Sequence, residues 1–145
     1  MKVVIQRAKR AKCIVNEKTT GKIEYGLLLL VGFTKGDSAE NIKKMVDKII
    51  KLRIFSDEDG KMNLNIKQVG GQILSISQFT LYANTNKGNR PSFEYALDSP
   101  TASILYDEFN RELGQTGIIV EQGIFGADMK LDFINDGPIT ITLEF

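Results

Sequence analysis

The stretch Gln72-Ile73-Leu74-Ser75-Ile76-Ser77-Gln78-Phe79-Thr80-Leu81-Tyr82 starts as a buried strand and then changes character. Its first aliphatic residues suit a strand that is covered on both faces of a sheet. Hydrogen-bonding side chains then stand where more aliphatic residues are expected, at Ser75, Ser77, Gln78 and Thr80. A buried hydroxyl or amide without a partner costs on the order of a few kcal/mol. Either the strand reaches the surface at its C-terminal end, or these groups face a ligand.

A polar, cationic and turn-rich loop, residues 84–93, follows this strand. A strand that runs into such a loop is a common way to build a binding site. Lys87 and Arg90 are candidates to hold phosphate groups in the loop. In the alternative interpretation both cations simply face water, and the local sequence leaves both interpretations open.

Length and composition indicate a single globular domain over residues 1–145. Hydrophobic residues make up 42% of the chain and charged residues 26%, as in typical globular proteins. The net charge of +1 gives no global basic field, so any contact with nucleic acid has to be local. The single Cys13 excludes an internal disulfide and suits a reducing cytosol. No apolar run approaches the roughly 20 residues that span a bilayer, and the N-terminus does not read as a signal peptide. We therefore expect a cytoplasmic protein with no membrane segment.

The chain contains no histidine. This excludes serine–histidine and cysteine–histidine nucleophiles, histidine metal sites and the usual general base near pH 7. The acidic Asp57-Glu58-Asp59 lacks the spacing of a twelve-residue calcium loop with its terminal glutamate. We therefore expect neither a metal nor a cofactor, and a catalytic site in this chain has to use other groups.

The hydrophobic patterns predict about eight strands and two helices. The continuous apolar run over residues 26–33 predicts a central strand covered on both faces. The other strands are expected at 3–15 (with a cationic interruption at 6–12), 20–25, 52–55, 72–82, 118–120, 131–134 and 139–145. Because strands stand both before the first helix and after the second, the expected class is mixed α/β (α+β), mainly β with two helices packed on a sheet.

Both helices carry start signals and an apolar stripe. Asp37 and Glu40 have the spacing of a capping box, and Ser99-Pro100 reads as an N-cap followed by a first-turn proline. The stripes follow helical spacing at Ile42, Met45, Val46, Ile49 and Ile50 in the first helix, and at Ala102, Leu105, Phe109 and Leu113 in the second.

Thr80 is a candidate nucleophile. A threonine hydroxyl needs a base, however, and the chain offers no histidine and no lysine beside it in sequence. We therefore expect Thr80 to position the substrate rather than to attack it. Consecutive backbone N–H groups near Gln78 and Phe79 can form an oxyanion hole, which needs no titratable side chain.

Three further places carry candidate site residues. Gly137-Pro138 is either a plain turn, which local chemistry favours, or a rigid arrangement of backbone carbonyls. Phe125 is either a core plug or an exposed platform beside Met129 for a flat ligand such as a nucleobase. Arg7 follows directly on a hydrophobic run, so we expect it to make a specific ionic or carbonyl contact.

Four segments taken together resemble one known family. They are Ser77-Gln78-Phe79-Thr80-Leu81, Lys87-Gly88-Asn89-Arg90-Pro91-Ser92-Phe93, Phe125-Gly126-Ala127 and Asn135-Asp136-Gly137-Pro138-Ile139-Thr140. Their order and the length of the chain closely match the D-aminoacyl-tRNA deacylase family, from Val3 to the C-terminus. Any one segment is weak evidence, and four in order are strong evidence.

This resemblance implies a barrel-like domain that forms a homodimer with its active sites at the interface. The family hydrolyses the ester that joins a D-amino acid, or misplaced glycine, to the terminal adenosine of tRNA. Its Ser-Gln motif meets the Gly-Pro motif of the other subunit, and the Gly-Pro bond is cis. Carried over, the catalytic segment is Ser77, Gln78, Phe79 and Thr80, and the substrate-binding residues are Gly137, Pro138, Asn135, Thr140, Phe125, Met129 and Arg7. Gly137 and Pro138 exclude L-amino acids, Arg7 holds their segment, and Phe125 lies against the adenine.

For the reaction we expect attack by a positioned water, helped by the ribose 2′-hydroxyl of the substrate, with main-chain donors stabilising the oxyanion. Two alternatives remain open. The first is a related deacylase tuned to tRNA mischarged with L-alanine. The second is a non-catalytic RNA-binding module that uses Phe125 for stacking and the loop from Lys87 to Arg90 for phosphate contact.

Overall fold

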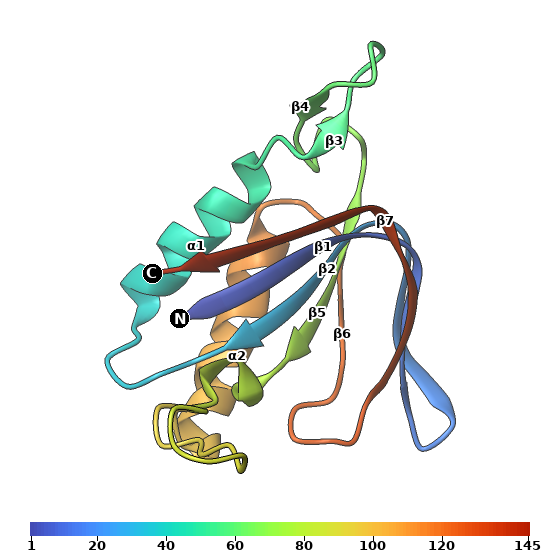
Figure 1. Ribbon diagram of the computed structural model, residues 1–145. Coiled ribbons are helices and arrows are strands. Elements are labelled where there is room, and N and C mark those ends of the chain that lie inside the picture. Colours follow the sequence, from blue (N-terminus) through green and yellow to red (C-terminus); the bar gives the residue numbers. More distant parts are fainter.

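The computed structural model describes residues 1–145, which form a main curved sheet with two helices behind it (Figure 1). The strands are β1 (Lys2–Val15), β2 (Lys18–Gly32), β3 (Phe55–Ser56), β4 (Met62–Leu64), β5 (Gln72–Ser77), β6 (Val120–Gln122) and β7 (Lys130–Glu144). The helices are α1 (Ala39–Lys51) and α2 (Ser99–Gln115), and a 3-10 turn spans Phe79–Tyr82. The expected mixed class with two helices is confirmed.

The main sheet has the strand order β6-β5-β2-β1-β7. β1 pairs antiparallel with β2 and β7, whereas β5 pairs parallel with β2 and β6. Asn16 and Glu17 close the β1–β2 hairpin with positive φ angles of 47° and 64°, the geometry of a type I′ turn. The chain then crosses from β2 to β5 through α1, and from β5 to β6 through α2. Since such crossovers keep one hand and both steps run the same way across the sheet, both helices cover the same face.

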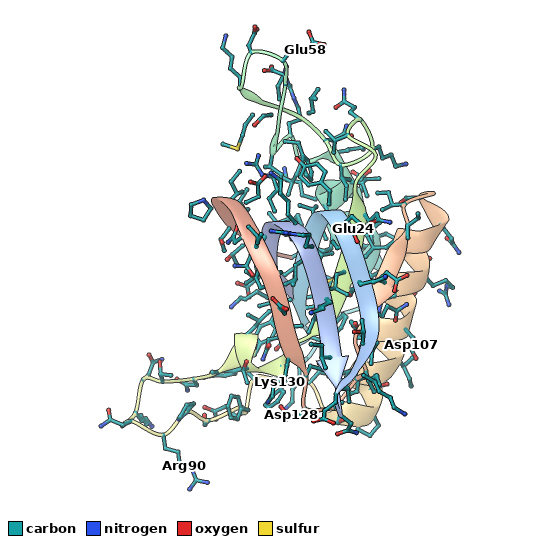
Figure 2. All side chains as sticks on the ribbon, turned by 90° about the vertical axis from the view of Figure 1, so that its right-hand side faces the viewer. Glu24, Glu58, Arg90, Asp107, Asp128 and Lys130 are labelled. Atoms are coloured by element: carbon teal, nitrogen blue, oxygen red, sulfur yellow. The ribbon has the colours of Figure 1, made fainter.

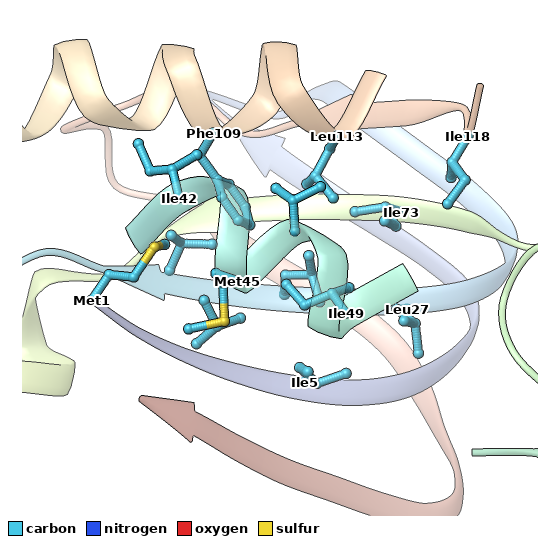
Figure 3. Packing of buried hydrophobic residues seen from close by; sticks show 14 of the residues in the cluster. Met1, Ile5, Leu27, Ile42, Met45, Ile49, Ile73, Phe109, Leu113 and Ile118 are labelled. Carbon is cyan, nitrogen blue, oxygen red and sulfur yellow. The ribbon is translucent and has the colours of Figure 1, made fainter. Parts of the chain in front are cut away.

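The larger of two cores lies between the helices and this face. Figure 3 shows Ile42, Met45 and Ile49 of α1 gathered with Phe109 of α2 and Ile5 of β1, and all five are fully buried. Burial of an aliphatic or aromatic side chain of this size stabilises the fold by about 1.5–3 kcal/mol. The predicted apolar stripe of the first helix is therefore its packing face.

A smaller core lies on the opposite face of the sheet. It consists of Ala8, Ala11, Cys13, Ile23, Leu28, Leu74 and Ile76, with Val15, Leu30, Met129, Leu131 and Phe133 packed against them. The long strands curve around this core and give the sheet a barrel-like shape (Figure 1). Along β2, Leu27 and Leu29 enter the larger core and Leu28 the smaller one, so the central strand is covered on both faces as predicted.

The strand predicted over residues 72–82 ends at Ser77 instead. The backbone N–H of Gln78 makes the last bond to β2, donating to the carbonyl of Val31 at 2.7 Å. Because β2 itself ends at Gly32, it offers no further partner, and residues 79–82 turn into the 3-10 helix. The strand thus surfaces at its C-terminal end, where Phe79 and Thr80 are exposed.

Several other predicted strands have different limits. β1 runs unbroken through the cationic residues 6–12, with a bulge at Arg10 where φ is 49°. Residues 20–25 and 26–33 belong to the single strand β2, which pairs with β1 along its length. The strand predicted at 52–55 is wrong except for its last residue, since only β3 pairs there, with β4.

β7 joins two predicted strands across a bulge that holds the Gly-Pro motif. Gln6 pairs with Thr140 and Ala8 pairs with Asn135, so residues 136–139 stand opposite Arg7 alone. A proline has no N–H for a ladder, and a bulge is one of the few places in a sheet that accepts it. The Gly137-Pro138 peptide bond is cis. The plain turn that local chemistry favoured is therefore wrong.

Each helix is capped one residue away from the predicted cap. Ser38 caps α1, and its backbone N–H donates to the side-chain oxygen of Asn41 at 3.1 Å. Asp98 rather than Ser99 caps α2. Asp37 is used elsewhere, because its carboxylate pairs with the ammonium group of Met1. Neither α1 nor α2 has the length and apolar character that crossing a bilayer requires.

Candidate functional site

A cavity of about 610 Å³ opens at the C-terminal end of β5. Its walls come from the ends of β2 and β5, the start of α2, the segment before α2, and the connection from β6 into β7. Of the predicted site residues, it brings together Ser77, Gln78, Phe79, Phe125 and Met129. The lining does not include Thr80, Arg7, Lys87, Arg90, Asn135, Gly137, Pro138 or Thr140.

The 3-10 turn presents free backbone donors at this cavity. The N–H of Gln78 is engaged with Val31, so the expected oxyanion donor at Gln78 is wrong. The N–H groups of Phe79 and Thr80 have no acceptor in the chain, because the first amides of a helical turn precede its hydrogen bonds. Phe79 lines the cavity, so its N–H is the main-chain donor best placed to meet a bound carbonyl oxygen.

Close packing holds this turn against β2. A Cβ atom at Gly32 would lie 2.9 Å from the carbonyl oxygen of Gln78 and 3.2 Å from Cβ of Leu81. Contacts this short are not tolerated, so only glycine lets the turn approach the end of β2. The amide of Leu81 donates back to the carbonyl of Gln78 at 3.3 Å and closes the turn.

Thr80 lacks the partners that a nucleophile needs. Its hydroxyl oxygen accepts a hydrogen bond from the side-chain amide of Gln78 at 2.5 Å. An amide N–H cannot take a proton from a hydroxyl, and no carboxylate, lysine or other base bonds Thr80. The expectation that Thr80 positions rather than attacks therefore agrees with its surroundings.

Phe125 and Met129 form the opposite wall. The N–H of Gly123 donates to the carbonyl of Ser75 at 3.0 Å, which ties the connection after β6 to β5. A Cβ at Gly123 would come within 2.5 Å of the Met129 sulfur and 3.1 Å of Ile76 Cδ1, so the connection folds tightly over β5. Phe125 is half-buried: it packs against the larger core and also lines the cavity. The core contact fits the plug interpretation, and the cavity-lining position leaves the platform interpretation a prediction.

An aromatic pair marks the mouth of the cavity. The rings of Phe79 and Phe93 meet edge to face with centroids 4.9 Å apart, and both are exposed. Phe93 ends the cationic loop, whose base is closed by hydrogen bonds between Asn84 and Ser92. Lys87 and Arg90 form no ion pair within the chain, and Figure 2 shows Arg90 pointing away from the body of the protein.

The charges that line the cavity itself are negative. Asp98 and Asp128 contribute carboxylates, and no lysine or arginine lines it. The N–H and hydroxyl of Thr101 bond Asp98 and hold the pKa of that carboxyl below its usual value. Asp128 pairs with Lys130 at 3.0 Å, near the start of β7 (Figure 2). The lining therefore favours a neutral or cationic ligand group over a phosphate.

Arg7 makes the contacts that its position predicted. Its Nε donates to the carbonyl of Asp136 at 3.0 Å and lies 3.3 Å from the carboxylate of the same residue. Its Nη1 donates to the carbonyl of Ile54 at 3.0 Å. Arg7 is 8% exposed, so these bonds are shielded from water and fix the Gly-Pro bulge to the body of the protein.

Side chains inside β7 complete this support. Asn135 accepts from the N–H of Ile139 at 3.0 Å and donates to the hydroxyl of Thr140 at 3.1 Å, which bridges the bulge. Gln6 donates to the same hydroxyl at 3.3 Å. Asn135 and Thr140 therefore shape the Gly-Pro segment within this chain.

The Gly-Pro bulge and the cavity lie far apart in one chain. Through the strand pairings, Ser77 is level with Val3 of β1, whereas the bulge is level with Arg7. Four residues along a strand span about 13 Å, and three strand spacings from β5 to β7 span about 14 Å. A separation on the order of 20 Å is too large for one amino acid to touch both motifs.

Sequence reasoning missed the wall that α2 contributes. Asp98, Ser99 and Ala102 line the cavity. The Ser99-Pro100 signal located the helix start, but nothing local indicated that it faces the end of β5. Phe93 was in a recognised segment, although its contact with Phe79 has no sequence signal.

Comparison with known proteins identifies the family. A family model described as D-Tyr-tRNA(Tyr) deacylase matches residues 4–144. The chain belongs to this family. Two D-aminoacyl-tRNA deacylases, from Lactobacillus delbrueckii subsp. bulgaricus and Lactobacillus helveticus, are 57% and 55% identical over 144 residues, with 99% of each chain covered.

Solved structures give the same fold. The c-Myc DNA Unwinding Element Binding Protein superposes with a TM-score of 0.94 at 37% identity, covering 100% of this chain and 99% of its own. A probable eukaryotic D-amino acid tRNA deacylase superposes with a TM-score of 0.84 at 18% identity, over 98% and 97% of the two chains, which supports the fold alone. Membership of the D-Tyr-tRNA(Tyr) deacylase family confirms the resemblance drawn from the four segments and makes the chain a hydrolase of this kind.

Proposed function

We propose that this chain hydrolyses the ester bond of D-aminoacyl-tRNA and releases the free D-amino acid and tRNA. The observation that carries the proposal is the free N–H of Phe79 at a cavity whose far wall is Phe125. An oxyanion donor and an aromatic surface for a base are what hydrolysis at the terminal adenosine of tRNA requires.

In this mechanism the terminal adenine lies against Phe125 and Met129. The ester carbonyl oxygen accepts from the N–H of Phe79, which stabilises the negative charge of the tetrahedral intermediate. A water beside the ribose 2′-hydroxyl attacks the carbonyl carbon. The bond from that carbon to the ribose oxygen breaks, and the ribose oxygen takes up a proton. The enzyme thus needs no side-chain nucleophile, in agreement with the amide partner of Thr80.

We propose further that the active form is a homodimer in which Gly137 and Pro138 of the partner close the site. The separation of the two motifs within one chain supports this arrangement, as does the exposure of Phe79 at 57% beside the cavity. The backbone of the Gly-Pro bulge then excludes the side chain of an L-amino acid. Glycine has no side chain to exclude, so glycine misplaced on tRNA(Ala) is also a substrate. Lys87 and Arg90, on the loop that ends at Phe93, contact phosphates of the acceptor end.

The related deacylase for L-alanyl-tRNA and the non-catalytic RNA-binding module are the competing functions. The carboxylates of Asp98 and Asp128 argue against phosphate inside this cavity, whereas the RNA-binding module would hold phosphate on the loop from Lys87 to Arg90, outside it. The two carboxylates suit the cationic α-amino group of an aminoacyl ester. The reducing environment that suits the buried, free Cys13 supports the cytoplasm as the compartment.

The decisive experiment compares D-tyrosyl-tRNA, L-tyrosyl-tRNA, glycyl-tRNA(Ala) and L-alanyl-tRNA at micromolar enzyme. We expect release of D-tyrosine and glycine, with L-tyrosyl-tRNA left intact. Equal rates on D-tyrosyl-tRNA and L-tyrosyl-tRNA refute the proposal. Preferential release of L-alanine supports the first alternative. Binding of uncharged tRNA without any release supports the RNA-binding module.

The shared site is tested by mixing two inactive variants. Phe79→Pro removes the donor, and Gly137→Val fills the Gly-Pro segment. After subunit exchange, each mixed dimer has one site free of both changes, so activity recovers to about a quarter of the wild-type value. No recovery, with exchange verified by mass, contradicts a site shared between subunits.

A further inference from the structure

Three elements that form walls of the cavity are linked through one backbone atom, the carbonyl oxygen of Ser75. It accepts a hydrogen bond from the N–H of Gly123 at 3.0 Å and from the hydroxyl of Tyr106 at 2.7 Å. A carbonyl has two lone pairs and can accept both bonds. Ser75 lies two residues before Ser77, and Gly123 lies two residues before Phe125. This single atom therefore links β5, α2 and the connection that carries Phe125.

Tyr106 also supports Phe125 directly. The two rings pack with centroids 5.9 Å apart and planes at 45°. Tyr106 itself is 2% exposed and does not line the cavity. Tyr106 therefore cannot contact a bound substrate and can affect it only indirectly, through Ser75 and Phe125.

Packing of the core does not require the hydroxyl group of Tyr106. Of the other buried residues of α2, Ala102, Phe109 and Leu113 are apolar and only Asn110 is polar, and a phenylalanine would fill the same space as Tyr106. A buried tyrosine hydroxyl needs a partner, and here that partner is Ser75. Burial raises the pKa of Tyr106, so the group stays a donor across the physiological range.

We propose that Tyr106 is a positioning residue, which fixes the Phe125 wall at a set distance from the Ser77–Thr80 segment through the Ser75 carbonyl. Its catalytic effect rests on the proposed deacylase function. When adenine lies on Phe125, this distance decides whether the ester carbonyl reaches the N–H of Phe79. Loosening the wall therefore costs rate more than it costs affinity, because a misplaced carbonyl is still bound but is less well stabilised in the transition state.

The test uses Tyr106→Phe, which removes one oxygen atom and keeps the ring against Phe125. Single-turnover deacylation of D-tyrosyl-tRNA, measured over a range of enzyme concentrations, separates the maximal rate from the half-saturating concentration. We expect the maximal rate to fall about tenfold or more, with a change of less than about threefold in half-saturation. The matched control is Phe109→Leu, one turn along the same face of α2 and away from the cavity. It lowers the melting temperature but keeps the maximal rate.

A second readout needs no substrate. Amide hydrogen exchange at Gly123, whose N–H donates to Ser75, is expected to speed up in Tyr106→Phe and to stay unchanged in Phe109→Leu, as followed by NMR. If the wild-type protein releases no amino acid from any charged tRNA, the deacylase proposal fails, while the exchange experiment still decides whether Tyr106 positions the wall.

The double variant Tyr106→Phe/Phe125→Ala tests the route of the effect. If Tyr106 acts through Phe125, its substitution lowers the rate much less once Phe125 is already gone. Unchanged exchange at Gly123 in Tyr106→Phe overturns the inference. So does an equal loss of rate in Phe109→Leu, or a full and independent effect in the double variant.

Discussion

Phe79 contributes to the cavity through its main chain as well as through its ring. The ring contacts Phe93 at the mouth, and the N–H of this cavity-lining residue has no partner in the chain. The backbone N–H of the neighbouring Gln78, by contrast, is already bonded to the carbonyl of Val31. At the scale of single residues, the proposed chemistry therefore depends on which of two adjacent amides the sheet leaves free.

Phe79→Pro tests this amide. Proline is accepted at the first position of a helical turn, where the N–H has no intrahelical acceptor, so the variant is expected to fold. Loss of one oxyanion donor is expected to lower the single-turnover rate about 100-fold or more. Phe79→Ala is the matched control, because it removes the ring and keeps the N–H. Equal rates in the two variants would mean that the ring, rather than the amide, is responsible.

Thr80→Ala separates positioning from covalent attack. Because the only side-chain partner of Thr80 is the amide of Gln78, we expect the rate of D-tyrosine release to fall less than about tenfold, the size of one neutral hydrogen bond. Rapid-quench measurement of a single turnover reports this rate. Complete loss of release in a variant that still binds tRNA would return the nucleophile role to Thr80.

At the scale of elements, the connection from β6 into β7 depends on Gly123. A Cβ there meets the Met129 sulfur, and also Ile76 Cδ1 and the Cys13 sulfur at 3.1 and 3.3 Å, so the chain cannot move aside freely. Gly123→Ala is expected to displace Met129 and Phe125 and to weaken binding of adenosine about tenfold, as measured by calorimetry or NMR titration. Gly126→Ala is a useful comparison, because a Cβ there would have no atom within 4 Å but the φ of 76° disfavours alanine. Weaker binding in Gly126→Ala alone would point to backbone conformation rather than to Met129.

The elements differ in how far the sequence predicts them. The apolar run of Leu27 to Val31 and the apolar stripe of α1 were predicted, because buried positions are visible in the sequence as runs or periodic patterns of hydrophobic residues. The end of β5 was not, since it depends on where its neighbour β2 stops. The Gly-Pro bulge was not predicted from local chemistry either, because its shape comes from Arg7, some 130 residues earlier in the chain. Contacts between distant segments leave no local pattern.

At the scale of the whole molecule, two buried tyrosines make stability depend on pH. Burial is the main reason that the pKa values of Tyr82 and Tyr106 are raised, and for Tyr82 the carboxylates of Asp37 and Glu144 add to it. In the unfolded chain both phenols titrate near their usual value of 10.0. Above that pH the unfolded chain loses protons that the folded chain keeps, so the free energy of unfolding falls as pH rises further.

Urea unfolding between pH 7 and 11 measures this dependence. We expect no contribution from the two phenols at neutral pH and a decline in stability that begins near pH 10. In Tyr82→Phe the decline is expected to be shallower, because one of the two phenols is gone. A decline of the same steepness in Tyr82→Phe would show that other groups cause it.

The pairing of β1 with β7 joins the first fifteen residues of the described chain to the last sixteen, with Lys2 opposite Glu144. During synthesis one edge of β1 stays unpaired until β7 has also left the ribosome. Pairings of such long range form late and slowly. The Gly-Pro segment, held by Arg7, is thus among the last parts to take shape. A chain that has not yet formed this pairing therefore lacks the proposed means of telling D- from L-amino acids.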